Sequence, residues 1–259
     1  MSLLTRQKSP GPALCAALGK LLRDSVGALD AFHENPEVRA HFLRTRVKRL
    51  QSLSRLAPKG RKWRESFLPP LCELKDLFAE TRDATIVLAL ASKYAPGEAQ
   101  HLRVASPPDL VGARHLAGLA AGLLHDYPRW EKIEWCDVAD RAAGTYRAAR
   151  KAWKVVVRPG AADAAFHGWR RRVKRLLYQC EYLGGQAHLV RLTRRVDKLG
   201  EILGEIQDIC MAEDWLARQH GLAVPADLPR RKEVLRRRAL RSGEALLSLK
   251  PRDFRKMLG

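Results

Sequence analysis

The sequence predicts an all-α protein built from two copies of one helical unit. Apolar residues recur at helical spacing over most of the 259 residues, and the one β-branched cluster, at 155–157, ends at Pro159. Prolines and glycines separate the periodic stretches, as helix boundaries require. A pattern of ten residues occurs twice, at 41–50 and at 167–176. A repeat on this scale predicts two structural copies.

Eight helices are expected between these breaks. Asn35 followed by Pro36 predicts a capping residue and the first residue of a helix. Pro69 and Pro70 lie inside the third predicted helix and are expected to kink or split it. No uncharged apolar stretch of about 18 residues occurs, so no membrane-spanning helix is expected. The predicted helices cover 13–33, 36–57, 62–95, 108–126, 131–157, 161–184, 186–219 and 227–249.

The internal repeat rests on two landmarks. The segments HFLRTRVKRL at 41–50 and HGWRRRVKRL at 167–176 share seven of ten positions and lie 126 residues apart. Downstream, Asp83 ends the segment ETRD and Asp208 ends the segment EIQD, 125 residues later. Two landmarks at nearly one offset predict two four-helix units, residues 1–128 and 129–259, joined near Pro128.

The charge of the chain points to a polyanionic partner. There are 48 Lys and Arg against 28 Asp and Glu, a net charge of +20. Residues 1–129 carry +8 and residues 130–259 carry +12, so the charge belongs to the helices and not to a tail. Nucleic acid, phosphate polymers and anionic membranes are the candidate partners.

The five cysteines are scattered, and no two have the spacing C-x-x-C. This excludes a disulfide framework or a zinc knuckle and favours reduced thiols in a cytoplasmic protein. The short apolar run at 13–18 is interrupted by Lys20 and Arg23, so it is interpreted as the start of the first helix and not as a signal peptide.

Cations of the second repeat fall on one side of a predicted helix. At about 100° per residue, His167, Arg170, Arg171, Lys174, Arg175 and Tyr178 share a sector opposite the apolar residues. The first repeat aligns His41, Arg44, Lys48 and Arg55 in the same way. Residues 167–178 include no acid, although like charges at i, i+4 repel by a few tenths of a kcal/mol. A bound anion would relieve that repulsion, whereas an ordinary solvated face mixes the two signs.

Neighbouring helices add more cations to the candidate site. Asp83, Asp208 and Glu181 are candidates to orient arginines, with local salt bridges as the alternative. The arginine run at 230–241 is either solvated surface or part of the site, and no metal site is expected because ligand spacing is lacking. The predicted anion-binding residues are His41, Arg44, Lys48, Arg49, Arg55, Arg147, Arg150, His167, Arg170, Arg171, Lys174, Arg175, Tyr178, Arg191, Arg194, Arg195 and Lys198.

Three motifs together resemble the CHAD family, the histidine-centred α-helical domain. They are H-x-x-R-x-x-x-K-R-L at 41–50 and 167–176, the segment LGEILGEIQD at 199–208, and Tyr146-Arg147 followed by Arg150. The resemblance covers about 13–250 of the chain, and Ala79 departs from it where the second copy has Gly204.

The resemblance implies two four-helix bundles related by pseudo-twofold symmetry, with a basic groove or cavity between them. It also implies binding of inorganic polyphosphate without catalysis, and association with polyphosphate granules.

Two other functions are weighed against this one. Nonspecific nucleic-acid binding is the alternative, because the charge alone supplies affinity. However, neither a helix-turn-helix nor a set of exposed aromatic residues for stacking bases is evident. An enzyme acting on phosphate polymers would need a phosphate-binding loop or an acidic cluster for Mg²⁺, and neither motif is found. No enzymatic activity and no cofactor are therefore expected.

Overall fold

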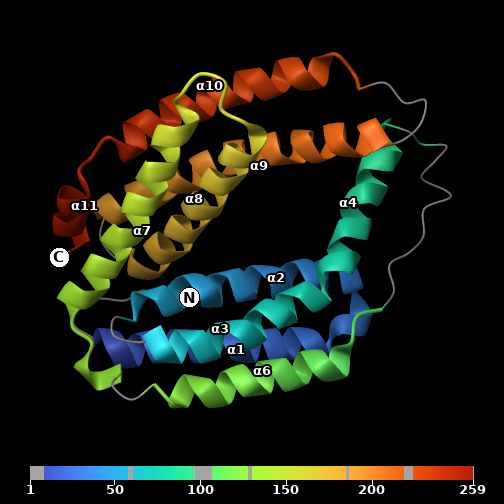
Figure 1. Ribbon diagram of the computed structural model, residues 1–259. Helices are drawn as coiled ribbons and strands as arrows, with labels where there is room; N and C mark the ends of the chain where they lie inside the picture. The colour runs from blue at the N-terminus through green and yellow to red at the C-terminus, as the bar shows by residue number, and fades with distance from the viewer. Residues whose placement is uncertain are drawn as a thin grey trace. The chain divides into compact units, whose positions relative to one another are not determined.

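The computed structural model describes residues 9–57, 61–94, 96, 107–127, 130–184, 187–218 and 224–258 (Figure 1). These residues form helices joined by turns and include no strand, which confirms the all-α class. Among the described helices, none combines the length and hydropathy needed to cross a bilayer. The chain divides into two compact units, Lys8–Glu134 and Trp135–Gly259. The predicted join at Pro128 lies outside the described residues.

In the first unit, four helices pack in a ring in which α1 contacts α2, α2 contacts α3, α3 contacts α6, and α6 returns to α1. A further helix, α4, follows α3 and contacts α2 (Figure 1). Asn35 caps α2 as expected, because its side chain accepts a hydrogen bond from the Val38 amide at 3.2 Å. The helices are α1 (Pro10–Asp30), α2 (Pro36–Leu53), α3 (Arg61–Leu77), α4 (Ala79–Tyr94) and α6 (Leu110–His125).

The second unit has the same order of contacts. Helix α7 contacts α8, α8 contacts α9, α9 contacts α10, and α10 returns to α7. Its core includes the fully buried Tyr146, Trp169 and Tyr182. The helices are α7 (Trp135–Val156), α8 (Asp163–Leu183), α9 (Ala187–Arg218), α10 (Asp227–Leu247) and α11 (Pro251–Leu258).

The predicted helix at 62–95 is two helices, and the break is not at the prolines. Helix α3 continues through Pro69 and Pro70, so a split at that pair was wrong, and a kink there stays a prediction. The φ angle of proline is compatible with a helix. Proline destabilises a helix because the carbonyl four residues earlier loses its hydrogen bond. Here those carbonyls belong to Glu65 and Ser66, which are exposed to water.

The break falls at Phe78, between α3 and α4. The Phe78 ring is fully buried and lies 5.4 Å from the ring of Phe32, centroid to centroid. In the second unit the corresponding stretch is the single 32-residue helix α9. The departure from the helical path therefore belongs to the first repeat alone.

A short helix that the sequence reading missed, α11, closes the second unit. It begins at Pro251, a favourable first residue, and its Phe254 stacks on Tyr146 with ring centroids 4.4 Å apart. Because α11 has only eight residues, it offers too few periods for a pattern to be recognised.

Gly243 of α10 provides a test of core packing. A Cβ there would lie 2.7 Å from Cδ1 of Trp153 and 2.7 Å from Cζ2 of Trp169. Gly243→Ala should therefore lower the free energy of unfolding by about 1–3 kcal/mol, because rigid indoles cannot yield. Urea denaturation would measure the change.

The control is Gly144→Ala in α7, where a Cβ would meet nothing within 4 Å. It should raise stability by about 0.5–1 kcal/mol through helix propensity. If both variants were equally stable, the tight packing at Gly243 would be refuted.

Candidate anion-binding site

The cations of α8 lie along one side of α9. His167 Nδ1 is hydrogen-bonded to Gln207 Oε1, and the next cations follow in antiparallel register. Arg170 lies beside Gly204, and Lys174 lies beside Gly200. We call His167, Arg170, Arg171, Lys174, Arg175 and Tyr178 the α8 row.

The two glycines of α9 leave the room that the α8 row occupies. A Cβ at Gly200 would lie 3.1 Å from Cε and 3.2 Å from Nζ of Lys174. A Cβ at Gly204 would lie 3.9 Å from Nε and Nη2 of Arg170. The two glycines of the segment LGEILG therefore match the spacing of the cations, because glycines four residues apart on α9 face cations four residues apart on α8.

The α8 row has an ion pair at Lys174. Lys174 Nζ lies 3.5 Å from a carboxylate oxygen of Asp197, and this pair is partly exposed, so it contributes little. Arg170 Nε is buried and makes no hydrogen bond within the described residues. Of the other cations in the row, Arg171 is exposed and Arg175 is half-buried.

The first repeat uses its arginine differently. Arg44, which corresponds to Arg170, donates from Nη1 to the Lys75 carbonyl at 2.7 Å. The break at Phe78 ends α3, so this carbonyl lacks an intrahelical donor, and Arg44 caps it. Lys48 and Arg55 are exposed, and Arg55 lies in the 3₁₀ turn Ser54–Leu56 after α2.

His41 lies among cations. Burial lowers its pKa below the ordinary value, and the charges of Lys48, Arg82 and Arg44 lower it further. Arg82 occupies the repeat position of Gln207, which binds His167 in the second copy. The two repeat histidines therefore have different neighbours.

The three carboxylates proposed to orient arginines have varied surroundings. Asp83 accepts a hydrogen bond from Arg82 Nη1 at 2.9 Å, which is a contact between chain neighbours. Asp208 is exposed, and Glu181 is half-buried. Their role in orienting the anion-binding arginines stays a prediction.

Two of the predicted arginines bind the end of α10. Arg150 Nε donates to the Leu247 carbonyl at 2.9 Å, and Arg195 Nη2 donates to the Ala245 carbonyl at 2.7 Å. The Tyr146 hydroxyl lies 3.1 Å from the Leu246 carbonyl. These donors satisfy the carbonyls at a helix C-terminus, which also attracts positive charge. The remaining predicted cations of α7 and α9, Arg147, Arg191, Arg194 and Lys198, are exposed.

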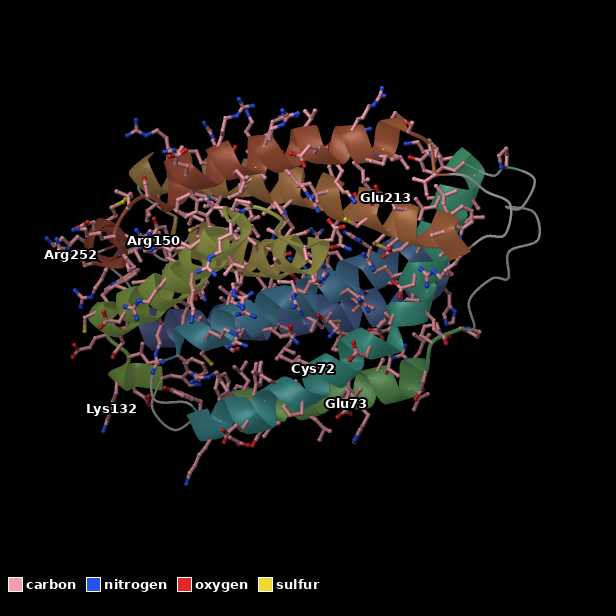
Figure 2. The ribbon with its side chains drawn as sticks, turned by 45° about the horizontal axis from the view of Figure 1, so that its top comes forward. Cys72, Glu73, Lys132, Arg150, Glu213 and Arg252 are labelled. Carbon is pink, nitrogen blue, oxygen red and sulfur yellow. The ribbon has the colours of Figure 1, made fainter. Side chains whose placement is uncertain are left out.

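A network of ion pairs joins α8, α9 and α10, and sequence analysis missed it. Lys232 contacts Glu213, and its Nζ lies 3.3 Å from an oxygen of Asp163. Arg236 also binds Asp163. Figure 2 shows Glu213 on the side of α9 that faces α10. Arg231 also pairs with Glu205, so at least three of the seven cations in the run at 230–241 are not simply solvated surface.

The same network contains the one group of metal-ligating side chains found in the described residues. Ligand atoms of Asp163, Cys210 and Glu213 lie within 4.8 Å of one another. Lys232 and Arg236 already balance these carboxylates. Burial alone would raise the pKa of Asp163, but hydrogen bonds from Cys210 and Arg236 and the nearby charges hold it below its usual value.

The thiol of this group is not ionised. Burial and the adjacent Asp163 raise the pKa of Cys210 to about 12. Since a protonated thiol is a poor metal ligand, the network is best described as an electrostatic contact between three helices.

Comparison with known proteins identifies one family. The family model of the CHAD domain matches residues 12–217, which include α1 to α9. No curated protein and no solved structure matches the chain.

The surroundings of His41 can be tested by its titration. His41 should titrate below the ordinary histidine pKa of about 6.5. Arg82→Gln should raise that pKa, because it removes one repelling charge. NMR of the imidazole resonances would follow both, with Lys62→Gln, an exposed cation of α3, as the control that leaves the pKa unchanged.

The same shift has a consequence for stability. Folded His41 binds a proton less readily than the unfolded chain does, so the free energy of unfolding falls as the pH drops through about 6.5 and below. A His41 pKa at or above the ordinary value would contradict the arrangement of cations around it.

Proposed function

We propose that this chain, which belongs to the CHAD domain family, binds inorganic polyphosphate and does not act as an enzyme. The observation that carries the proposal is the α8 row, an acid-free series of cations held along the glycines of α9. Its charges repel one another, and its ion pair between Lys174 and Asp197 is partly exposed. An anionic chain would relieve this repulsion.

The shape of the row suits a thin polymer. Successive cations on one helix side lie about 5–6 Å apart, and the nine residues 167–175 span about 12 Å along the axis. A flexible phosphate chain can follow such a series. It needs charge at regular intervals and no aromatic platform.

Both repeats are proposed to contribute to binding. The rings α1–α2–α3–α6 and α7–α8–α9–α10 place α2 and α8 at the same position in each unit. This supports two pseudo-symmetric four-helix bundles as the architecture. The predicted groove or cavity between them stays a prediction.

Nonspecific nucleic-acid binding is the second candidate, and the surface argues against it. Within the described residues, the exposed large hydrophobic side chains are all Val or Leu, and the aromatic side chains are buried or half-buried, so none of these rings is fully exposed for stacking on bases. Duplex DNA presents its phosphates on a wide, stiff cylinder, whereas a thin, flexible phosphate chain can follow a row on a single helix side.

We also propose that the protein associates with polyphosphate granules in the cytoplasm. Polyphosphate granules concentrate the polymer, so a protein that binds polyphosphate is expected to collect on them. Fluorescence microscopy of a tagged chain beside a polyphosphate stain would test it.

The main prediction concerns the α8 row. Reversing Arg170 and Lys174 to Glu should weaken polyphosphate binding at least tenfold. The matched control reverses Lys132 and Arg252, which are exposed and outside the predicted site (Figure 2). Because the control makes the same change in net charge, it separates the loss of contacts at the α8 row from the general effect of lower net charge on polyphosphate binding. Fluorescence anisotropy with labelled polyphosphate would measure both.

Two further results are expected from that assay. Log affinity should fall linearly with log salt concentration, since binding releases counterions. Long polyphosphate should bind at least tenfold more tightly than duplex DNA per phosphate near physiological salt. Tighter binding to duplex DNA, or an affinity that salt does not change, would overturn the proposal.

A separate prediction concerns the two repeats. Reversing Lys48 and Arg49 to Glu should weaken binding about as much as reversing Lys174 and Arg175. This follows if the repeats supply one site with equivalent residues. A large loss from one pair and none from the other would show that a single repeat binds the polymer.

A further inference from the structure

A second row of cations lies on α7, apart from the α8 row. No Asp or Glu occurs between Asp140 and Asp163 in the sequence. In this stretch Arg147, Lys151, Lys154 and Arg158 are all exposed. We call these four residues the α7 row.

The α7 row is aligned along one side of the helix. At about 100° per residue, its four members fall within about 60° of one another. They span 12 residues, or about 16 Å. Arg158 lies just past the helix end but continues the turn, since its amide bonds to the Val155 carbonyl at 3.3 Å.

No acid balances the α7 row. Within the described residues, none of its four members makes an ion pair or a side-chain hydrogen bond. Asp140, the nearest acid on the N-terminal side of α7, is bound to Arg255 of α11. Asp163, the nearest on the C-terminal side, is bound to Lys232 and Arg236.

The body of α7 separates this row from the α8 row. Arg150 and Trp153 mark the side of α7 that faces α10, through the Leu247 carbonyl and Gly243 respectively. The α7 row lies on the solvent edge of that side. The buried Val138 and Ala149 lie on the opposite side of the helix, and α7 also contacts α8.

The first repeat lacks a corresponding row. Leu14, Leu18 and Leu22 of α1 have the same buried spacing as Val138, Ala142 and Tyr146 of α7. In that alignment the row positions of α1 hold Arg23, Gly27, Asp30 and Glu34. Asp30 and Glu34 are both acids in ion pairs, with Arg114 and Arg39. The α7 row is therefore not part of the duplicated site.

We propose that the α7 row is a second, independent binding surface for a phosphate polymer, which moves Arg147 out of the site predicted from the sequence. This inference rests on the proposed function. Two of the four cations are lysines, which act as point charges and do not require a paired acceptor. A protein with two separate rows holds two chains, or two stretches of a long chain, and so gains avidity and can link chains.

The test counts the short chains that each protein binds. The α7 variant is Lys151→Gln, Lys154→Gln and Arg158→Gln, which leaves Arg147 and the α8 row in place. The control is Lys132→Gln, Arg252→Gln and Lys256→Gln, which removes the same charge from exposed positions elsewhere. Isothermal titration calorimetry uses polyphosphate no longer than one row, about 16 Å.

We expect the wild-type protein and the control to bind one chain more than the α7 variant does. The affinity of the remaining site should change less than threefold. With long chains, the α7 variant should bind at least fivefold more weakly than the control, because avidity is lost. Circular dichroism would verify that each variant is folded.

Each other outcome is decisive. An unchanged number of chains in the α7 variant would overturn the second surface while leaving the proposed function intact. The same number bound with lower affinity would show that both rows form one site. Stronger competition by single-stranded DNA than by polyphosphate at the α7 row would overturn the choice of polymer. Failure of the wild-type protein to bind any polyphosphate would remove the proposed function itself.

Discussion

The candidate site depends on the close approach of α8 to the glycines of α9. Half-buried cations lose part of their hydration. The neighbouring helix must also leave room for their side chains. Gly200 and Gly204 supply that space beside Lys174 and Arg170. A Cβ at position 200 would crowd the end of the Lys174 side chain and make it shift, whereas a Cβ at position 204 would only touch Arg170. The geometry of a single pair of helices therefore controls the charge density of the site.

The net charge of +20 divides into cations with different roles. Lys232 and Arg236 are neutralised by carboxylates, so they hold helices together and offer little field to a ligand. Arg150 and Arg195 donate to carbonyls of α10. A carbonyl satisfies a donor without cancelling its charge, so these two arginines combine a structural role with a contribution to the positive potential.

Much of the fold could be predicted from the sequence, because its signals are local. Apolar spacing, proline positions and the repeated decapeptide predicted the helices and placed His167, Arg170 and Lys174 together on one side of α8. The break at Phe78 could not be predicted, because it depends on a ring, Phe32, that is distant in the sequence. The contact of Asp163 with Lys232 joins residues 69 apart, and no periodicity within either helix indicates it.

The two copies of the decapeptide have acquired different electrostatic surroundings. In the second copy the helix partner is continuous, and Gln207 gives His167 a neutral neighbour. In the first copy the partner is broken, Arg44 is drawn to the free Lys75 carbonyl, and Arg82 faces His41.

The surroundings of His41 leave it less often protonated than an ordinary histidine. An anion bound there would stabilise the imidazolium, so binding at the first copy would take up a proton. Sequence duplication alone thus does not make the copies equivalent, because burial and the charges of Lys48, Arg82 and Arg44 lower the pKa of His41 and so link the charge of the first site to pH.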